Sequence, residues 1–303
     1  MRKVIITGAD GFIGRKLVKL FLSNDFEVHA IVLNENFGVV DKNLYTYKCF
    51  FEDYDTLKYK LPKNSELFYH LAWKGVYGES FKDYETQLLN IKYTIDSLII
   101  AKHIGCKKFI LASTVNTLET VNTIVNKTTS TRYTNIYSSS KLTAEVMCKT
   151  FAYNLDIEFN TGIIAMVYGE NNNSRMIPNV VMSNLINGKE SNLVDPDLPF
   201  DMIYVDDVCK AFYAIGLKGI NFKTYYIGSG KITTFKQVFD KVRDIINPNG
   251  IINYGYYKEK PSIVYDFIDV NELYNDTGFI PDSSFEESIK ITTKWLIESG
   301  NNI

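Results

Sequence analysis

The sequence predicts an α/β fold in which a parallel sheet is covered by helices on both faces. Two observations predict this class. Strand-like and helix-like segments alternate through the first half of the 303-residue chain, as in repeated strand–helix–strand units. In addition, a short apolar run at residues 4–7 leads directly into a glycine-rich turn and then an apolar-periodic helix. Backbone amides of such a turn and of the helix start can bind a pyrophosphate, so we expect a doubly wound sheet with a dinucleotide site.

The expected strands are apolar runs bounded by polar or glycine-containing segments. They cover residues 3–7, 27–33, 44–51, 66–72, 108–114 and 157–165. Expected helices cover residues 12–22, 81–104 and 178–186, and Gly105 suits the end of the second. A further helix begins near Tyr137 with Asn135 as its N-cap. The Thr- and Asn-rich residues 116–134 before it are expected to form a loop.

The regular alternation loosens after residue 168, where polar loops and short helices take over. We therefore expect two domains that share one compact body. Residues 1–168 form the dinucleotide-binding domain, with return elements at about 201–228. Residues 169–303 form a smaller substrate-binding domain.

Composition excludes several classes of function. Hydrophobic residues make up 46%, charged residues 22%, and the net charge is −2, which favours neither nucleic acid nor an anionic membrane as partner. No apolar segment is long enough for a signal peptide or a membrane span. The cysteines are scattered without paired spacing, as in the reduced core of a cytoplasmic protein, and they are Cys49, Cys106, Cys148 and Cys209. The three histidines lack metal-ligand spacing, so no metal is expected, and His70 is interpreted as structural.

Tyr137 and Lys141 stand four residues apart at the start of an expected helix. Residues at this spacing share one helix face, so the ammonium of Lys141 can approach the phenol of Tyr137. A nearby positive charge favours the phenolate and lowers the pKa of a tyrosine toward neutral pH. Tyr137 is therefore a candidate acid/base, although the same spacing also fits a surface lysine beside a half-buried tyrosine.

Two hydroxyl residues, Ser113 and Thr114, end the expected fifth strand. Doubly wound sheets bind their ligands at the carboxyl ends of the strands, which places these hydroxyls near the expected ligand. Taken alone, each could instead satisfy backbone groups at the strand end.

Together these stretches resemble a known family. The pattern Gly8-x-x-Gly11-x-x-Gly14, the strand-end hydroxyls and Tyr137-x-x-x-Lys141 are similar to those of the extended short-chain dehydrogenase/reductases, in particular the nucleotide-sugar epimerases, dehydratases and ketoreductases. The runs DMIYVDDV at 201–208 and YIGSG at 226–230 match further family segments in the same order. The resemblance implies a Rossmann fold, NAD or NADP as cofactor, a nucleotide-diphospho-sugar substrate and a homodimer.

The resemblance also implies residue roles. Tyr137 exchanges the proton, Lys141 assists it and binds the nicotinamide ribose, and Thr114 holds the reacting oxygen, with Ser113 as the alternative. The implied cofactor-binding residues are Gly8, Gly11, Phe12, Ile13, Gly14, Arg15, Leu71, Ala72, Asn90 and Lys141. The implied substrate-binding residues are Ser113, Trp73, Asn116, Met166 and Lys258.

Departures from the family pattern bear on the reaction. Val32 stands where NAD-preferring members carry an aspartate, so nothing repels a 2′-phosphate and NADP is favoured over NAD, with Arg15 as a possible phosphate partner. A reductase releases its cofactor each cycle, so this difference favours a 4-ketoreductase of a 4-keto-6-deoxy sugar nucleotide. The alternatives are an NAD-dependent 4-epimerase, a non-catalytic dinucleotide-sensing protein, and a reductase of a non-nucleotide ketone. Val115-Asn116 follows Thr114 where dehydratases carry Asp-Glu, which argues against dehydration.

Overall fold

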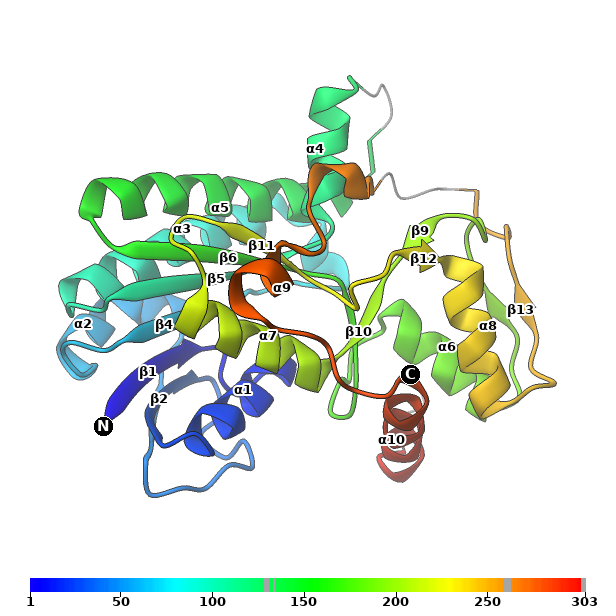
Figure 1. Cartoon of the computed structure of the whole chain (residues 1–303), viewed down its shortest axis with the longest axis horizontal. Helices are drawn as coiled ribbons and strands as arrows, with labels where there is room; N and C mark the ends of the chain where they lie inside the picture. The colour runs from blue at the N-terminus through cyan, green and yellow to red at the C-terminus, as the bar shows by residue number, and fades with distance from the viewer. Residues whose placement is uncertain (128–130, 133, 259–262, 301–303) are drawn as a thin grey trace.

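A computed structural model of the chain describes residues 1–127, 131–132, 134–258 and 263–300. Its centre is a seven-stranded parallel sheet in the order β11-β6-β5-β4-β1-β2-β3 (Figure 1). This arrangement confirms the predicted fold class. The strands are β1 Arg2–Thr7, β2 Phe26–Val32, β3 Leu44–Lys48, β4 Leu67–His70, β5 Lys108–Thr114, β6 Glu158–Ile164 and β11 Thr224–Ile227.

Helices cover both faces of the sheet (Figure 1). On one face lie α1 (Phe12–Leu22) and α7 (Val205–Lys218), and on the other α3 (Tyr84–His103) and α5 (Thr134–Leu155). Successive side chains of a strand point to opposite faces, so Ile6 joins the core under α1 and α7 while its neighbour Ile5 joins the core under α3 and α5. Burial on both faces explains why β1, β2 and β4 are mainly apolar, whereas the edge strand β3 is partly exposed and more polar.

A second group of elements follows β6 and lies at the right of Figure 1. It contains α6 Ile177–Ile186, α8 Phe235–Ile246 and α10 Phe285–Glu298. Three two-stranded sheets accompany these helices: β7 Met166–Tyr168 with β10 Met202–Tyr204, β8 Ser191–Asn192 with β13 Ile252–Asn253, and β9 Pro199–Phe200 with β12 Thr233–Thr234. The division of the chain at residue 168 stays a prediction.

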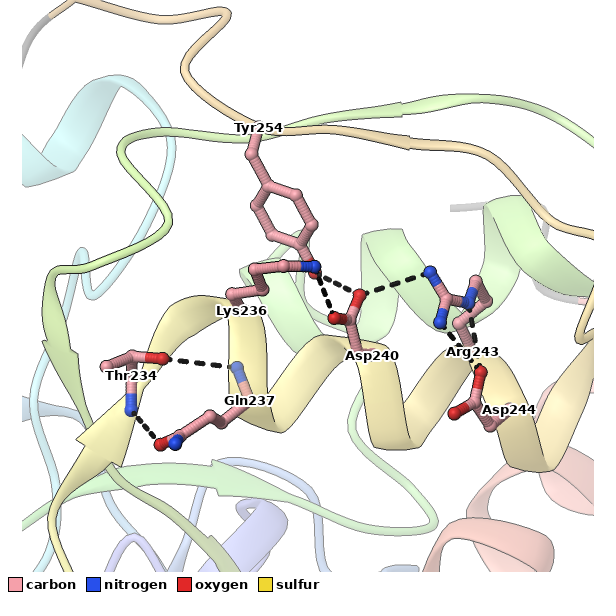
Figure 2. A network of polar contacts seen from close by, with 7 residues as sticks. All are labelled: Thr234, Lys236, Gln237, Asp240, Arg243, Asp244 and Tyr254. Carbon is pink, nitrogen blue, oxygen red and sulfur yellow. Dashed lines mark hydrogen bonds and ion pairs between the residues drawn. The ribbon is translucent and has the colours of Figure 1, made fainter.

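Polar contacts fix α8 at its start and along its length, as Figure 2 shows. Thr234 and Gln237 form a capping box, in which each side chain accepts the backbone N–H of the other at 3.2 Å. Farther along, Asp240 accepts from Lys236 at 2.5 Å and from the Tyr254 hydroxyl at 3.1 Å. The second contact ties the helix to the segment that follows β13.

Two expected boundaries differ in the structure. The segment expected to be a loop contains a helix, α4 (Thr117–Val125), whose Glu119 is buried in an ion pair with Arg132. That pairing is non-local, so local sequence does not signal it. Residues 128–130 and 133 of this segment lie outside the described part of the chain. Asn135 is not the N-cap of α5, because its backbone N–H already donates to the Arg132 carbonyl and the helix begins at Thr134.

Two further elements are shorter than expected. The third strand ends at Lys48, since the chain turns into a 3₁₀ helix at Phe51–Thr56. The long helix begins at Tyr84 rather than residue 81, because the Asp83 carboxylate caps the N–H groups of the next turn and a separate 3₁₀ turn, Glu79–Phe81, precedes it. The remaining short helices are α2 Leu57–Lys60, α9 Glu272–Thr277 and a 3₁₀ turn at Tyr265–Phe267.

All four cysteines are buried and free of disulfides. None of the helices in the described part of the chain combines the length and apolarity that crossing a membrane requires.

Candidate active site

The glycine-rich turn joins the end of β1 to the start of α1. Gly8 has a φ of +65°, and a Cβ there would lie 2.9 Å from the Ala72 backbone nitrogen at the end of β4. A Cβ on Gly14 would lie 2.1 Å from the Gly8 carbonyl oxygen. Only glycine therefore lets the turn pack both on the β4 end and on the first turn of α1.

A cavity of about 490 Å³ opens beside this turn. Gly8 and Gly11 line it together with Leu71 and Ala72 at the end of β4. Its position at the carboxyl ends of β1, β2 and β4, next to a helix N-terminus, fits a dinucleotide. Its other lining residues are Asp10, Ile31, Val32, Leu33, Cys49, Phe50, Phe51, Glu52, Tyr54, Trp73 and Lys74.

Thr114 at the end of β5 lies beside Tyr137 in the first turn of α5, and its side chain favours the ionised form of the phenol. Tyr137 is only 7% exposed. Burial raises its pKa well above that of an ordinary tyrosine, and the neighbouring Thr114 side chain lowers it only in part. Without a bound cofactor, the phenol is therefore protonated at neutral pH.

Lys141 is buried one turn after Tyr137, but its ammonium contacts the Ala112 carbonyl and the Trp73 ring. Its Nζ donates to the Ala112 carbonyl at 3.1 Å and lies 3.9 Å from the centre of the Trp73 ring. Burial lowers the pKa of Lys141 to about 7. The prediction that Lys141 lowers the pKa of Tyr137 is wrong for this structure, because burial dominates at both residues and the ammonium is held over the indole.

Two aromatic rings enclose Tyr137. Phe81 stacks on its ring with centroids 4.5 Å apart, and the Trp73 ring meets it edge-on at 6.2 Å. Because Trp73 also lines the cavity, the catalytic candidates adjoin the space in which a dinucleotide fits. Trp73 was a sequence candidate, whereas nothing in the local pattern signalled Phe81.

Two amide side chains of α3 hold the segment that carries Trp73. Asn90 accepts from the Lys74 N–H at 2.9 Å and donates to the Lys74 carbonyl at 2.8 Å. Gln87 accepts from the Trp73 Nε1 at 2.9 Å and donates to the carbonyls of Gly75 and Ser80. Asn90 thus acts as a brace beside the site. Gln87 was missed, although its place one turn before Asn90 is a usable signal.

Ser113 and Thr114 point to opposite faces of β5. The Ser113 hydroxyl lies near the buried Glu145 carboxyl, whose other oxygen accepts from Thr224 at 3.0 Å. Burial raises the pKa of Glu145 above that of an ordinary glutamate. Thr114, and not Ser113, is the hydroxyl that meets Tyr137.

His70 ends β4 and is fully buried behind the site. Its ring nitrogens contact the Thr7 hydroxyl at 3.0 Å and the Thr94 hydroxyl at 3.2 Å. Burial lowers the pKa of His70 to about 3, so the ring is neutral at pH 7. The geometry agrees with the structural interpretation of this histidine.

Some sequence candidates lie apart from this centre. Lys258 is exposed and donates to the Gly255 carbonyl of its own loop at 3.1 Å. Met166 begins β7 and pairs with β10. Asn116 precedes α4, and its backbone N–H donates to the Thr114 hydroxyl at 3.4 Å. Phe12 and Ile13 are half-buried against the core in the first turn of α1. Of these, only Asn116 touches a catalytic candidate, and its role stays a prediction.

Asp10, inside the glycine-rich turn, was missed by the sequence reasoning. Its Oδ2 accepts the N–H groups of Leu33 and Asn34 at 3.0 and 2.9 Å. The premise that no carboxylate stands at the end of β2 is therefore wrong, since Asp10 supplies one from the neighbouring turn. An acidic residue in a turn of this kind is the signal that could have revealed it.

Asp201 of the DMIYVDDV segment is structural. It is 2% exposed, and its Oδ2 accepts from the Tyr226 hydroxyl at 2.7 Å and the Ser229 N–H at 2.9 Å. We expect Asp201→Ala to lower the free energy of unfolding by roughly 2–4 kcal/mol, because the Tyr226 hydroxyl and the Ser229 N–H would lose their acceptor. Urea denaturation measures this change. The control is Asp197→Ala at an exposed position, which should change the free energy of unfolding by less than about 0.5 kcal/mol. An equal effect of both variants would contradict the assignment.

Within the residues that the structure describes, no cluster of three or more His, Cys, Asp or Glu side chains could hold a metal ion.

Comparison with known proteins decides the family. Residues 4–228, well over half of the chain, match the NAD dependent epimerase/dehydratase family. The chain belongs to this family. It is 25% identical to a putative UDP-glucose 4-epimerase of Methanocaldococcus jannaschii, over 97% of this chain and 98% of that protein.

Two solved enzyme structures share the fold of this chain. UDP-glucose 4-epimerase of Thermotoga maritima, solved with UDP-glucose, superposes with a TM-score of 0.79 at 21% identity, covering 98% of this chain and 99% of that one. The Bordetella bronchiseptica enzyme WbmF, solved with NADH, superposes with a TM-score of 0.80 at 20% identity, covering 98% of this chain and 92% of that one. At these identities the likeness concerns the fold.

Proposed function

We propose that the chain is an NAD-dependent 4-epimerase of a nucleotide-diphospho-sugar. The observation that carries the proposal is the half-buried Thr114 beside the buried Tyr137, close to Lys141 and next to the cavity at the glycine-rich turn. A dehydrogenation at a secondary alcohol needs one group to take the hydroxyl proton and one to hold the oxygen. The pair supplies both.

In the proposed mechanism the turn residues Gly8 and Gly11 and the start of α1 would hold the pyrophosphate, and Lys141 the nicotinamide ribose. The bound nicotinamide supplies hydride acceptance and return at C4 of the sugar. Thr114 would donate a hydrogen bond to the C4 oxygen. Tyr137 would first lose its own phenol proton when the positively charged nicotinamide binds, because a nearby positive charge favours the phenolate, and would then take the C4 hydroxyl proton as the C4–H bond breaks. Tyr137 returns the proton to the same oxygen after the 4-keto sugar has presented its other face. The buried site keeps bulk water from this proton.

The choice of epimerase over reductase follows from two points. The sequence argument for a reductase relied on the absence of a carboxylate at the end of β2, and Asp10 removes that premise. A relative that spans nearly the whole chain is described as a putative UDP-glucose 4-epimerase. An epimerase gives back the hydride that it takes, so it gains from a cofactor that stays bound.

The test uses purified protein without added cofactor. We expect UDP-glucose or UDP-N-acetylglucosamine to be converted to its 4-epimer, detected by NMR, and NAD to be released on denaturation in near-stoichiometric amount. Net oxidation of NADH or NADPH with a 4-keto-6-deoxy sugar nucleotide, together with no epimer formation, would reverse the proposal in favour of a reductase.

A separate prediction concerns dehydration. We expect no 4-keto-6-deoxy product from dTDP-, UDP-, GDP- or CDP-hexoses, because Val115 and Asn116 follow Thr114 and neither side chain exchanges protons at neutral pH. Val115 is also buried, so it cannot reach the sugar. Mass spectrometry for loss of water checks this, and a dehydrated product at a rate comparable to epimerisation would contradict it.

We also propose that the chain forms a homodimer through α3 and α5. These helices pack against each other and expose several large apolar side chains, Leu88, Leu89, Val146 and Met147. Exposed apolar residues on neighbouring helices support a self-complementary interface. Light scattering should give twice the chain mass for the wild type and the chain mass for Leu88→Glu/Val146→Glu. A monomeric wild type would refute the proposal.

A further inference from the structure

Asp10 connects two segments that meet at one edge of the cavity. Its Oδ2 accepts the backbone N–H groups of Leu33 and Asn34, the first two residues after β2. Its own carbonyl accepts from the Arg15 Nε at 2.7 Å. The side chain is thus fixed between the turn and the end of β2.

At this edge, proteins of this fold distinguish NAD from NADP, which carries an additional 2′-phosphate. In a doubly wound fold, an acid near the end of the second strand binds the ribose 2′-hydroxyl, or an arginine nearby accepts the 2′-phosphate. Val32 holds the strand-end position and can do neither. Asp10, Val32 and Leu33 line the same cavity, so Asp10 brings a carboxylate to this edge from the glycine-rich turn.

The charge balance at this edge disfavours a phosphate. Both backbone donors after β2 are already occupied by Asp10, and a phosphate adds close to two negative charges beside that carboxylate. Lys74 is the one lysine or arginine in the cavity lining. Arg15 lies outside this lining, and its Nε donates to the Asp10 carbonyl.

We propose that Asp10 makes this chain select NAD(H) over NADP(H), in place of an acid at the end of β2. The proposal deepens the proposed function, since it rests on the cavity being the dinucleotide site. Oδ2 stays on the two amides, and Oδ1, which has no hydrogen bond to any described residue, accepts the ribose 2′-hydroxyl. The same oxygen repels a 2′-phosphate.

Direct binding tests this without turnover. NADH and NADPH are titrated separately into cofactor-free protein, and Kd is measured from energy transfer between tryptophan and the reduced nicotinamide. We expect the wild type to bind NADH at least tenfold more tightly than NADPH. Asp10→Asn keeps an oxygen for the two amides but removes the charge, so it should bring the two Kd values to within about threefold, mainly by tighter NADPH binding.

Glu52→Gln is the matched control, because it removes one negative charge from the same cavity lining. It should leave the ratio of the two Kd values within about twofold of the wild type. A wild type that prefers NADPH, an unchanged ratio in Asp10→Asn, or an equal change in Glu52→Gln would each overturn the proposal. Arg15→Gln should leave the ratio unchanged, and a selective loss of NADPH binding there would assign a phosphate site to Arg15 instead.

A further measurement needs no variant and covers a failure of Asp10→Asn to fold. AMP and adenosine 2′,5′-bisphosphate compete with NADH on the wild type, and AMP should be the stronger competitor by at least tenfold. The reverse order would refute the proposal. Failure of the epimerase proposal is distinguishable, because a strong preference for NADH without conversion of any sugar nucleotide would leave the role of Asp10 intact.

Discussion

Replacing Tyr137 by phenylalanine is expected to lower kcat by roughly 10²–10⁴, the usual contribution of a positioned acid/base. The ring packs on Phe81 and Trp73, and phenylalanine preserves both contacts. Only the hydroxyl and its contact with Thr114 are lost. The fold and the Kd for NADH should therefore stay close to those of the wild type, while the chemical step slows.

Tyr153→Phe is the matched control, since Tyr153 lies on the same helix but is 75% exposed. It should keep the wild-type kcat. Single-turnover kinetics with NADH binding measured in parallel separate loss of chemistry from loss of cofactor. A Tyr137→Phe enzyme that turns over at the wild-type rate would show that another group moves the proton.

The sheet and the position of the strand-end hydroxyls could be predicted because they follow from short-range patterns. Fully buried parallel strands give unbroken apolar runs, and the glycines of the first turn are required by backbone geometry alone. Parallel strands bring their carboxyl ends to one edge, so a strand ending in Ser113-Thr114 had to present one hydroxyl there. That Thr114 rather than Ser113 meets Tyr137 was implied by the resemblance to the family.

Contacts between segments that are distant in sequence could not be predicted in the same way. The bond from Asp10 to Leu33 and Asn34 joins residues 23 and 24 positions apart, and depends on how the turn packs against the β2 end. The position of Lys141 over Trp73 depends on a segment that α3 holds in place. Because those contacts are not visible in the sequence, the sequence patterns predicted an ordinary charged lysine at position 141 and no carboxylate at the end of β2.

The burial of Lys141 leads to a second large effect, a gain in stability when its ammonium is removed. Lys141→Met keeps the length and apolar stem of the side chain but not the charge. With the pKa lowered from 10.5 to about 7, protonating the unfolded chain favours unfolding by roughly 4 kcal/mol at pH 7. The lost bond to the Ala112 carbonyl and the lost contact with Trp73 offset part of this. We expect the variant to be more stable than the wild type by about 1–3 kcal/mol at pH 7, and to lose catalysis.

The pH dependence identifies the cause of that gain. Between pH 7 and pH 10.5 the unfolded chain holds the Lys141 proton while the folded chain has largely released it, so the wild type becomes more stable as pH rises. From pH 7 to pH 9 this contribution grows by about 2 kcal/mol. The advantage of Lys141→Met in urea unfolding should therefore shrink at pH 9, whereas the exposed Lys149→Met should match the wild type at both pH values. A Lys141→Met protein less stable than the wild type at pH 7, or an advantage that does not change with pH, would show that the ammonium is well solvated or fully paired in the folded protein.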